Sequence, residues 1–139
     1  MKIFALRLQP HQDLKVSLKE FINTNHIQAG FVLTAVGSLQ QATLRFADQT
    51  GSQVFQGKFE IVSLVGTLSL QGFHLHIAIA DSAGKTIGGH LQEGCLIYTT
   101  AEVVIGASQE LVFSRVVDEQ TGFMELSIAP GTLEIPKDQ

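Results

Sequence analysis

Hydrophobic and polar residues alternate most regularly between residues 73 and 80, where the chain reads Phe-His-Leu-His-Ile-Ala-Ile-Ala. A period of two is typical of a β-strand with one buried face. Residues 81–84, Asp-Ser-Ala-Gly, have the composition of a turn, and Gly84 can adopt the left-handed conformation that closes a three-residue hairpin loop. We therefore expect a β-hairpin over residues 72–91.

The loop of this hairpin determines which side chains face each other. With residues 82–84 as the loop, His76 faces His90, and His74 lies two residues earlier on the same face. Directly opposed side chains have Cβ atoms about 4.5–5.5 Å apart, and diagonal ones about 7–8 Å, so three imidazoles can converge on one metal ion. A bulge at the Gly-Gly pair 88–89 would instead turn His90 to the other face, and the sequence leaves this open.

The rest of the chain predicts one helix and several further strands. Apolar residues at positions 14, 18, 21 and 22 follow the spacing of an amphipathic helix, which Asp13 can cap and residues 23–25 end. The Gly-Ser pair 37–38 is expected to interrupt one strand, and Gly66 to bend or bulge another. Alternating or β-branched runs predict strands over residues 2–8, 31–36, 42–46, 59–70, 95–107, 111–117 and 123–128.

One early helix with many hairpin-linked strands predicts the α+β class, with a mainly antiparallel sheet of about seven strands. A length of 139 residues suits a single domain over residues 1–139. Prolines and a glycine make the tail, residues 130–139, the segment expected to be loose. The chain is 45% hydrophobic and 16% charged, which favours a packed core over disorder.

Cysteine content and charge limit the cellular compartment and the binding partners that we expect. The single Cys95 cannot form an internal disulfide, which agrees with a reducing compartment, and its apolar neighbours favour a buried structural thiol. No apolar run is long enough for a bilayer and residues 1–9 lack a signal-peptide core, so we expect a cytoplasmic protein with no membrane segment. Nine basic and 13 acidic residues give a net charge of −4, and the basic ones are scattered, which disfavours nucleic-acid binding by this chain alone.

The three hairpin histidines are the clearest chemical signal in the sequence. Three-histidine sites bind zinc and leave a coordination position for water or substrate. Glu60 and Glu102 lie in neighbouring predicted strands, where either can supply a fourth ligand or a hydrogen-bond acceptor for a ligating imidazole. The alternative interpretation is that His74 and His76 form a half-exposed polar face and that His90 belongs to a loop.

Short segments elsewhere in the chain carry a family resemblance. In order they are Asp13-Leu14, Gly37-Ser38, Ala42-Thr43-Leu44-Arg45, Gly57-Lys58-Phe59-Glu60-Ile61, Ser63-Leu64-Val65-Gly66-Thr67, His74-Leu75-His76, Gly88-Gly89-His90-Leu91, Gly94-Cys95 and Ala101-Glu102-Val103-Val104-Ile105. Together, from about Phe4 to Ile128, they resemble the plant and prokaryote conserved (PPC or PCC) domain. In plants this domain follows an AT-hook in nuclear DNA-binding proteins, whereas in bacteria and archaea it stands alone.

The resemblance implies an α+β subunit that forms a homotrimer. It also implies that His74, His76 and His90 match histidines that bind zinc in some prokaryotic members. The chain has no Arg-Gly-Arg-Pro core, so it resembles the standalone prokaryotic type without an AT-hook, and DNA binding is not carried over. The segment matching the plant trimer and partner contacts has lysine in place of arginine, which removes a planar bidentate fork, and reads Gly57-Lys58-Phe59-Glu60-Ile61-Val62.

A partner surface is expected even without the resemblance, because one helix covers only part of so apolar a sheet. The residues we expect between subunits are Thr43, Arg45, Phe59 and Ile61. Our leading interpretation is a homotrimeric cytoplasmic module with a regulatory or interaction role and a zinc site. The alternative is a small hydrolytic metalloenzyme that activates water on its metal, with Glu60 or Glu102 as general base. A direct DNA-binding protein is a third possibility.

Overall fold

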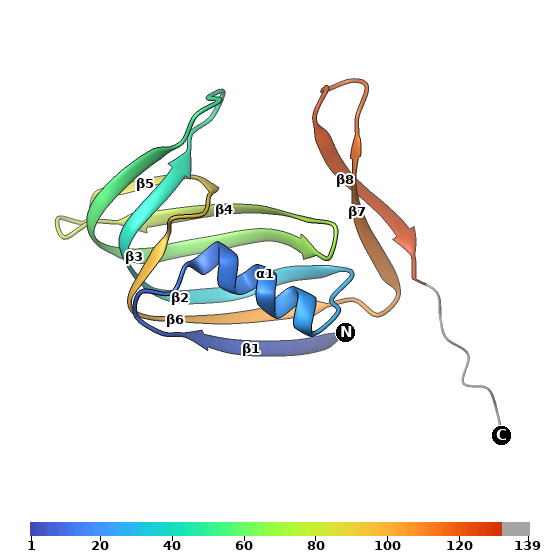
Figure 1. The fold of residues 1–139 in the computed structure, drawn as a ribbon, viewed down its shortest axis with the longest axis horizontal. Helices are drawn as coiled ribbons and strands as arrows, with labels where there is room; N and C mark the ends of the chain where they lie inside the picture. Colours follow the sequence, from blue (N-terminus) through green and yellow to red (C-terminus); the bar gives the residue numbers. More distant parts are fainter. Residues whose placement is uncertain (132–139) are drawn as a thin grey trace.

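The computed structural model describes residues 1–131, which form one helix and eight strands (Figure 1). The fold is α+β and mainly antiparallel, as the sequence predicts. In chain order the elements are β1 (Lys2–Leu8), α1 (Leu14–Thr24), β2 (Gly30–Arg45), β3 (Gln53–Ser69), β4 (Gly72–Ala80), β5 (Thr86–Leu91), β6 (Leu96–Ala107), β7 (Leu111–Val117) and β8 (Met124–Pro130).

Six of the strands form one antiparallel sheet in the order β1-β6-β2-β3-β4-β5. The edge strand β5 also pairs with the end of β2, where Leu44 lies opposite Leu91 and Arg45 opposite His90. Because of this second pairing, β2, β3, β4 and β5 close into a ring in which each strand pairs with two of the others. The ring brings β2 next to the histidine hairpin, although the two are distant in the sequence.

Helix α1 lies across the main sheet and buries its apolar side chains against it (Figure 1). Leu14, Leu18 and Ile22 are fully buried, which is the side-chain pattern that the sequence predicts. Asp13 caps the helix, because its Oδ1 accepts a hydrogen bond from the amide of Val16 at 3.1 Å. Its Oδ2 accepts a second from the amide of Gly94 at 2.7 Å, so the cap also ties the helix to the loop before β6.

Two strands differ from the sequence prediction. The two predicted strands 31–36 and 42–46 are joined in one continuous strand, β2, which ends at Arg45, because Gly37 introduces a shift in register instead of a break. A Cβ at Gly37, where φ is +152°, would overlap the carbonyl oxygen of Thr100 on the neighbouring strand. Strand β3 begins at Gln53, well before the predicted start at Phe59.

The last two strands form a separate two-stranded sheet, the β7–β8 hairpin. It stands beside the end of the main sheet instead of extending it (Figure 1). Pro130, predicted to lie in a loose tail, is the last residue of β8 and pairs with Leu111. The rest of the predicted tail, residues 132–139, lies outside the described residues.

No helix within residues 1–131 combines the length and the apolar character needed to cross a membrane.

Candidate metal site

The β4–β5 hairpin has the register that the sequence predicts. Its loop is closed by Asp81, whose amide donates to the carbonyl of Lys85 and whose carbonyl accepts from the amide of Gly84, both at 2.9 Å. His76 lies opposite His90. The Gly-Gly pair 88–89 stays in register with β4, without a bulge, so His90 remains on the face of the other two histidines.

Close contacts with neighbouring strands explain why positions 88 and 89 are glycines. A Cβ at Gly88 would lie 2.8 Å from the carbonyl oxygen of Ile77, and one at Gly89 would lie 2.8 Å from that of Arg45. Strand β5 therefore passes close to β4 on one side and to the end of β2 on the other. This close approach holds His90 between the two neighbouring strands.

The three imidazoles converge on one point. Nε2 of His74 and Nε2 of His76 are 3.2 Å apart, and one nitrogen from each of the three rings lies within 4.8 Å of the others. Zinc–nitrogen bonds of about 2.0–2.1 Å in a tetrahedral site place ligand nitrogens about 3.3 Å apart. The separation of His74 and His76 is therefore close to that in a zinc site, and the third imidazole lies near enough to complete a set of three ligands.

The surroundings favour neutral imidazoles, the form that binds metals. The pKa of His74 lies below its ordinary value, first because burial disfavours the imidazolium and then because His76 and Arg115 are close. Burial also lowers the pKa of His90, and Arg45, which is its cross-strand partner, lowers it further. Two of the three ring systems therefore lose their protons more easily than a solvated histidine.

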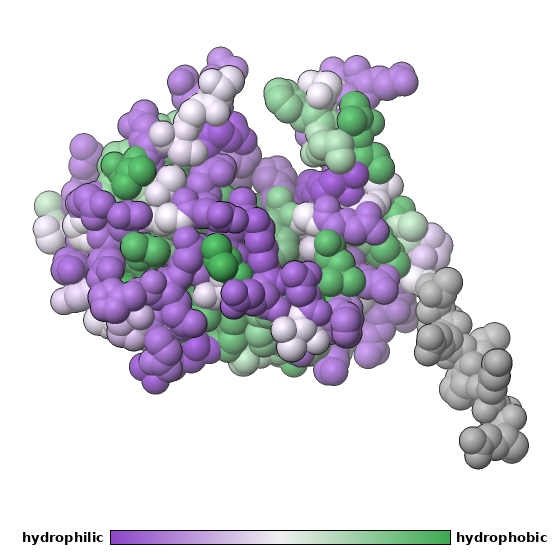
Figure 2. All heavy atoms as spheres, in the orientation of Figure 1, coloured by the Kyte–Doolittle hydropathy of each residue, from purple (hydrophilic) through white to green (hydrophobic). Residues whose placement is uncertain are grey.

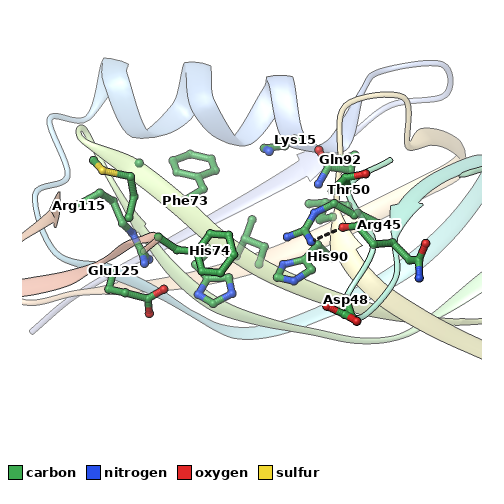
Figure 3. Close-up of a pocket in the computed structure, with 16 residues that line it drawn as sticks. Lys15, Arg45, Asp48, Thr50, Phe73, His74, His90, Gln92, Arg115 and Glu125 are labelled. Carbon is green, nitrogen blue, oxygen red and sulfur yellow. Dashed lines mark hydrogen bonds between the residues drawn. The ribbon is translucent and has the colours of Figure 1, made fainter. Parts of the chain in front are cut away.

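A hollow of about 920 Å³ opens beside His74 and His90. Figure 3 shows Arg115 and Glu125 beside His74, and Arg45 on the other side, next to His90. The charged side chains around the hollow are Lys15, Arg45, Asp48, Arg115 and Glu125. Its apolar wall is formed by Phe73, Leu75, Leu91, Phe123 and Met124.

The two glutamates proposed from the sequence lie away from the histidines. Glu60 pairs with Ala80, four residues along β4 from His76, which is about 13 Å at the usual rise of a strand. Glu102 lies on β6, between Arg7 and Val36, and two strands separate β6 from β4. Among the described residues, the cluster of potential metal ligands consists of the three histidines alone.

The carboxylates that line the hollow, Asp48 and Glu125, were missed because no spacing in the sequence links them to the histidines. Glu125 comes from the β7–β8 hairpin and Asp48 from the loop after β2. Asp48 has a positive φ of 57°, which is uncommon for a residue other than glycine, but the sequence does not reveal it.

The residues expected between subunits occupy several environments. Thr43 and Ile61 are buried already within the single chain, and their place between subunits stays a prediction. Arg45 faces the hollow, and Phe59 is half-buried against the core. In the segment 57–62, Val62 is exposed, and Nζ of Lys58 lies 4.0 Å from the ring centroid of Tyr98.

The sequence model of the Plants and Prokaryotes Conserved (PCC) domain matches residues 1–109. The chain belongs to the PCC domain family. The matched part contains all three histidines and ends before β7. The β7–β8 hairpin, which forms one wall of the hollow, lies beyond it.

Known proteins and structures resemble this PCC domain over most of its length. A hypothetical protein from Salmonella cholerae-suis is 40% identical, with a TM-score of 0.92 over 93% of this chain and 94% of the other. A metal-containing protein from Archaeoglobus fulgidus is 28% identical, with a TM-score of 0.78 over 91% of this chain and 94% of the other. A bifunctional protein GlmU from Synechococcus sp. is 55% identical over 94% of this chain. The chain spans only 21% of that relative's length.

Proposed function

We propose that this chain is a zinc-binding PCC-domain protein in which His74, His76 and His90 hold the ion. The observation that carries the proposal is the convergence of three ligand nitrogens within 4.8 Å of one another. Neutral imidazoles suit zinc, and the Archaeoglobus fulgidus relative, described as metal-containing, supports a metal in this fold.

We further propose that the domain assembles as a homotrimer and acts as a cytoplasmic regulatory or interaction module. Exposed apolar side chains on the sheet support an assembly surface; they include Val36, Val54, Val62 and Val65. The Synechococcus relative supports the module, because a segment like this chain makes up about a fifth of a larger bifunctional protein. Cys95 is fully buried, and burial raises the pKa of its thiol to about 11, which suits a structural thiol in a reducing compartment.

A metal-dependent hydrolytic enzyme is a second candidate, and the hollow beside the histidines favours it. A zinc ion held by three histidines would supply a Lewis acid with an open coordination position. Glu125 lies on the His74 side of the hollow, where its carboxylate can accept a proton. If this candidate is right, Glu125→Gln keeps its zinc but loses turnover of activated esters or phosphoesters, whereas a pure module shows no turnover with either protein.

Elemental analysis of untagged protein tests the metal site. We expect about one zinc per chain in the wild type and none in His76→Ala, which removes a central ligand. His26→Asn is the matched control, because His26 is exposed, lies outside the cluster and has a φ of 51°, which asparagine tolerates. Equal zinc in the wild type and His76→Ala, or none in either, would overturn the assignment.

A further inference from the structure

Three cationic side chains from three different elements line the hollow: Lys15 from α1, Arg45 from β2 and Arg115 from β7. None of them forms an ion pair within residues 1–131, where the salt bridge found joins Lys19 to Glu93. The hydrogen bonds of the two arginines go to neutral acceptors. Arg45 Nη1 donates to the carbonyl of Gln49 at 3.0 Å, and Arg115 Nη2 donates to the hydroxyl of Thr67 at 2.8 Å.

The arginines are held in place beside the histidines. Arg45 is the cross-strand partner of His90, so the pairing of β2 with β5 fixes its position. The aliphatic stem of Arg115 crosses Gly72, where a Cβ would lie 3.0 Å from its Cγ, and its head is bound to Thr67. Both guanidinium groups retain donors that could bind a ligand, because each has five N–H groups.

Positive charge in this arrangement exceeds what the two carboxylates can balance. Lys15, Arg45 and Arg115 face Asp48 and Glu125, and a divalent ion on the histidines would add two further positive charges. Lys15 is half-buried beside the hollow, and this burial lowers the pKa of its ammonium. An anion in the hollow would balance this charge without any rearrangement of the fold.

The size and walls of the hollow indicate an organic anion. Its volume of about 920 Å³ is in the range of small-molecule sites, which is about 300–1,000 Å³, and far exceeds the space that one inorganic ion fills. Phe73 and Phe123 contribute aromatic surface, and Leu75, Leu91 and Met124 are apolar. Such a wall suits a ligand with an apolar body as well as a charged group.

We propose that the hollow binds a small organic anion whose carboxylate or phosphate group lies over the three histidines, between Arg45 and Arg115, with its apolar body against Phe73 and Phe123. Only the placement of the anionic group over the histidines rests on the proposed zinc site, because that group would occupy the open coordination position. The arginines, the lysine and the apolar wall do not depend on the ion.

Isothermal titration calorimetry of the full chain tests the proposal, with protein prepared both zinc-loaded and after treatment with EDTA. The probes are phenyl phosphate, benzoate, inorganic phosphate and, as a neutral aromatic, benzyl alcohol. We expect phenyl phosphate or benzoate to bind the zinc-loaded protein with a dissociation constant of about 1 mM or below, and inorganic phosphate to bind more weakly. Comparison of phenyl phosphate with benzoate distinguishes a phosphate site from a carboxylate site.

Substitutions identify the residues that hold the anion. Arg45→Gln and Arg115→Gln should each weaken binding of the preferred aromatic anion by about tenfold or more, because each removes a charge-assisted hydrogen bond. Arg7→Gln is a matched control, since Arg7 also donates to a threonine hydroxyl, that of Thr100, but lies on β1 outside the hollow. Arg45→Lys keeps the charge and should retain part of the affinity.

The proposal is overturned if neither aromatic anion binds, if benzyl alcohol binds as tightly, or if Arg7→Gln weakens binding as much as the other two. Its failure is distinguishable from failure of the metal site. Stoichiometric zinc without anion binding removes only this inference. Anion binding that depends on Arg45 and Arg115 in a protein that takes up no zinc removes only the metal.

Discussion

The β4–β5 and β7–β8 hairpins are closed by similar turns but have different surroundings. In the first, Asp81 Oδ1 accepts hydrogen bonds from the amides of Ala83 and Lys85, both at 2.9 Å. In the second, Asp118 Oδ1 accepts from the amides of Gln120 and Thr121, at 2.8 and 3.1 Å. In both turns an aspartate carboxylate accepts two backbone amides, so this turn chemistry does not determine whether a hairpin joins the main sheet.

The two hairpins differ in whether their strands also pair with other strands of the molecule. Strand β4 pairs with β3, and β5 pairs with the end of β2, whereas β7 and β8 pair only with each other. Ile77 and Ile79 on β4 are buried, but Phe123, which closes the turn just before β8, is 72% exposed. Figure 2 shows the apolar side chains of the β7–β8 hairpin at the molecular surface. A two-stranded hairpin with so little burial gains little stability of its own.

The candidate site combines these two hairpins. The three histidines lie on the rigid β4–β5 hairpin, which suits ligands whose positions must be fixed. Arg115 and Glu125 come from the β7–β8 hairpin, which faces the histidines across the hollow. The three histidines are therefore held by the core, while part of the wall of the hollow belongs to the less buried element.

The largest expected effect is the loss of stability caused by a substitution in the buried β4–β5 hairpin. Ile77 is 2% exposed and Ile128 is 60% exposed, so they form a matched pair of isoleucines on the two hairpins. Ile77→Ala should lower the free energy of unfolding by about 2–5 kcal/mol because it leaves a cavity in the core. Ile128→Ala should change it by no more than about 0.5 kcal/mol. Urea denaturation followed by circular dichroism measures both, and equal losses would refute the distinction between the hairpins.

Hydrogen exchange should sharpen the same distinction without a substitution. Backbone amides of β7 and β8 should exchange at least about tenfold faster than those of β4, because the β7–β8 hairpin can open without disrupting the main sheet. Exchange measured by NMR or mass spectrometry gives this ratio. Matching protection in both hairpins would mean that something covers β7 and β8 in solution.

The sequence predicted the β4–β5 hairpin well because its determinants are local. Alternation over residues 73–80 and a glycine in the left-handed region, Gly84 with φ of +80°, together set loop and register. Those two facts alone bring His76 opposite His90. The resemblance to the PCC domain added the family, which the match to residues 1–109 confirms.

The polar residues around the histidines could not be predicted, because long-range pairing brings them there. Arg45 reaches His90 only through the second pairing of β2 with β5, which no turn in the sequence specifies. Glu125 lies at the hollow only because β7 and β8 form a separate hairpin beside the main sheet. Glu60 was proposed because it lies in a neighbouring strand, but the register places it opposite Ala80, about 13 Å along β4 from His76.

The assembly state is a further prediction. We expect sedimentation equilibrium to give about three times the 15.1 kDa mass of the chain, because apolar side chains on β3 are exposed in the single subunit. Val62→Asp, which places a charge on the exposed side of β3, should shift the equilibrium towards monomer if β3 lies at the interface. A wild-type protein that stays monomeric at high micromolar concentration would contradict the trimer.

The smallest expected effect separates the contributions of the two hairpins to the histidines. In metal-free protein, Arg45→Gln should raise the pKa of His90 and, by less, that of His74, whereas Arg115→Gln should raise that of His74, because each change removes a nearby positive charge. Arg7→Gln should leave both unchanged. The direction has a consequence for stability: the unfolded chain binds protons at these imidazoles more readily, so metal-free protein should lose stability as the pH falls below about 6.5 and keep it above. NMR titration of the imidazole C–H resonances measures each pKa, and a rise in the pKa of His90 with Arg115→Gln as large as that with Arg45→Gln would show that the arginines do not act separately from the two sides.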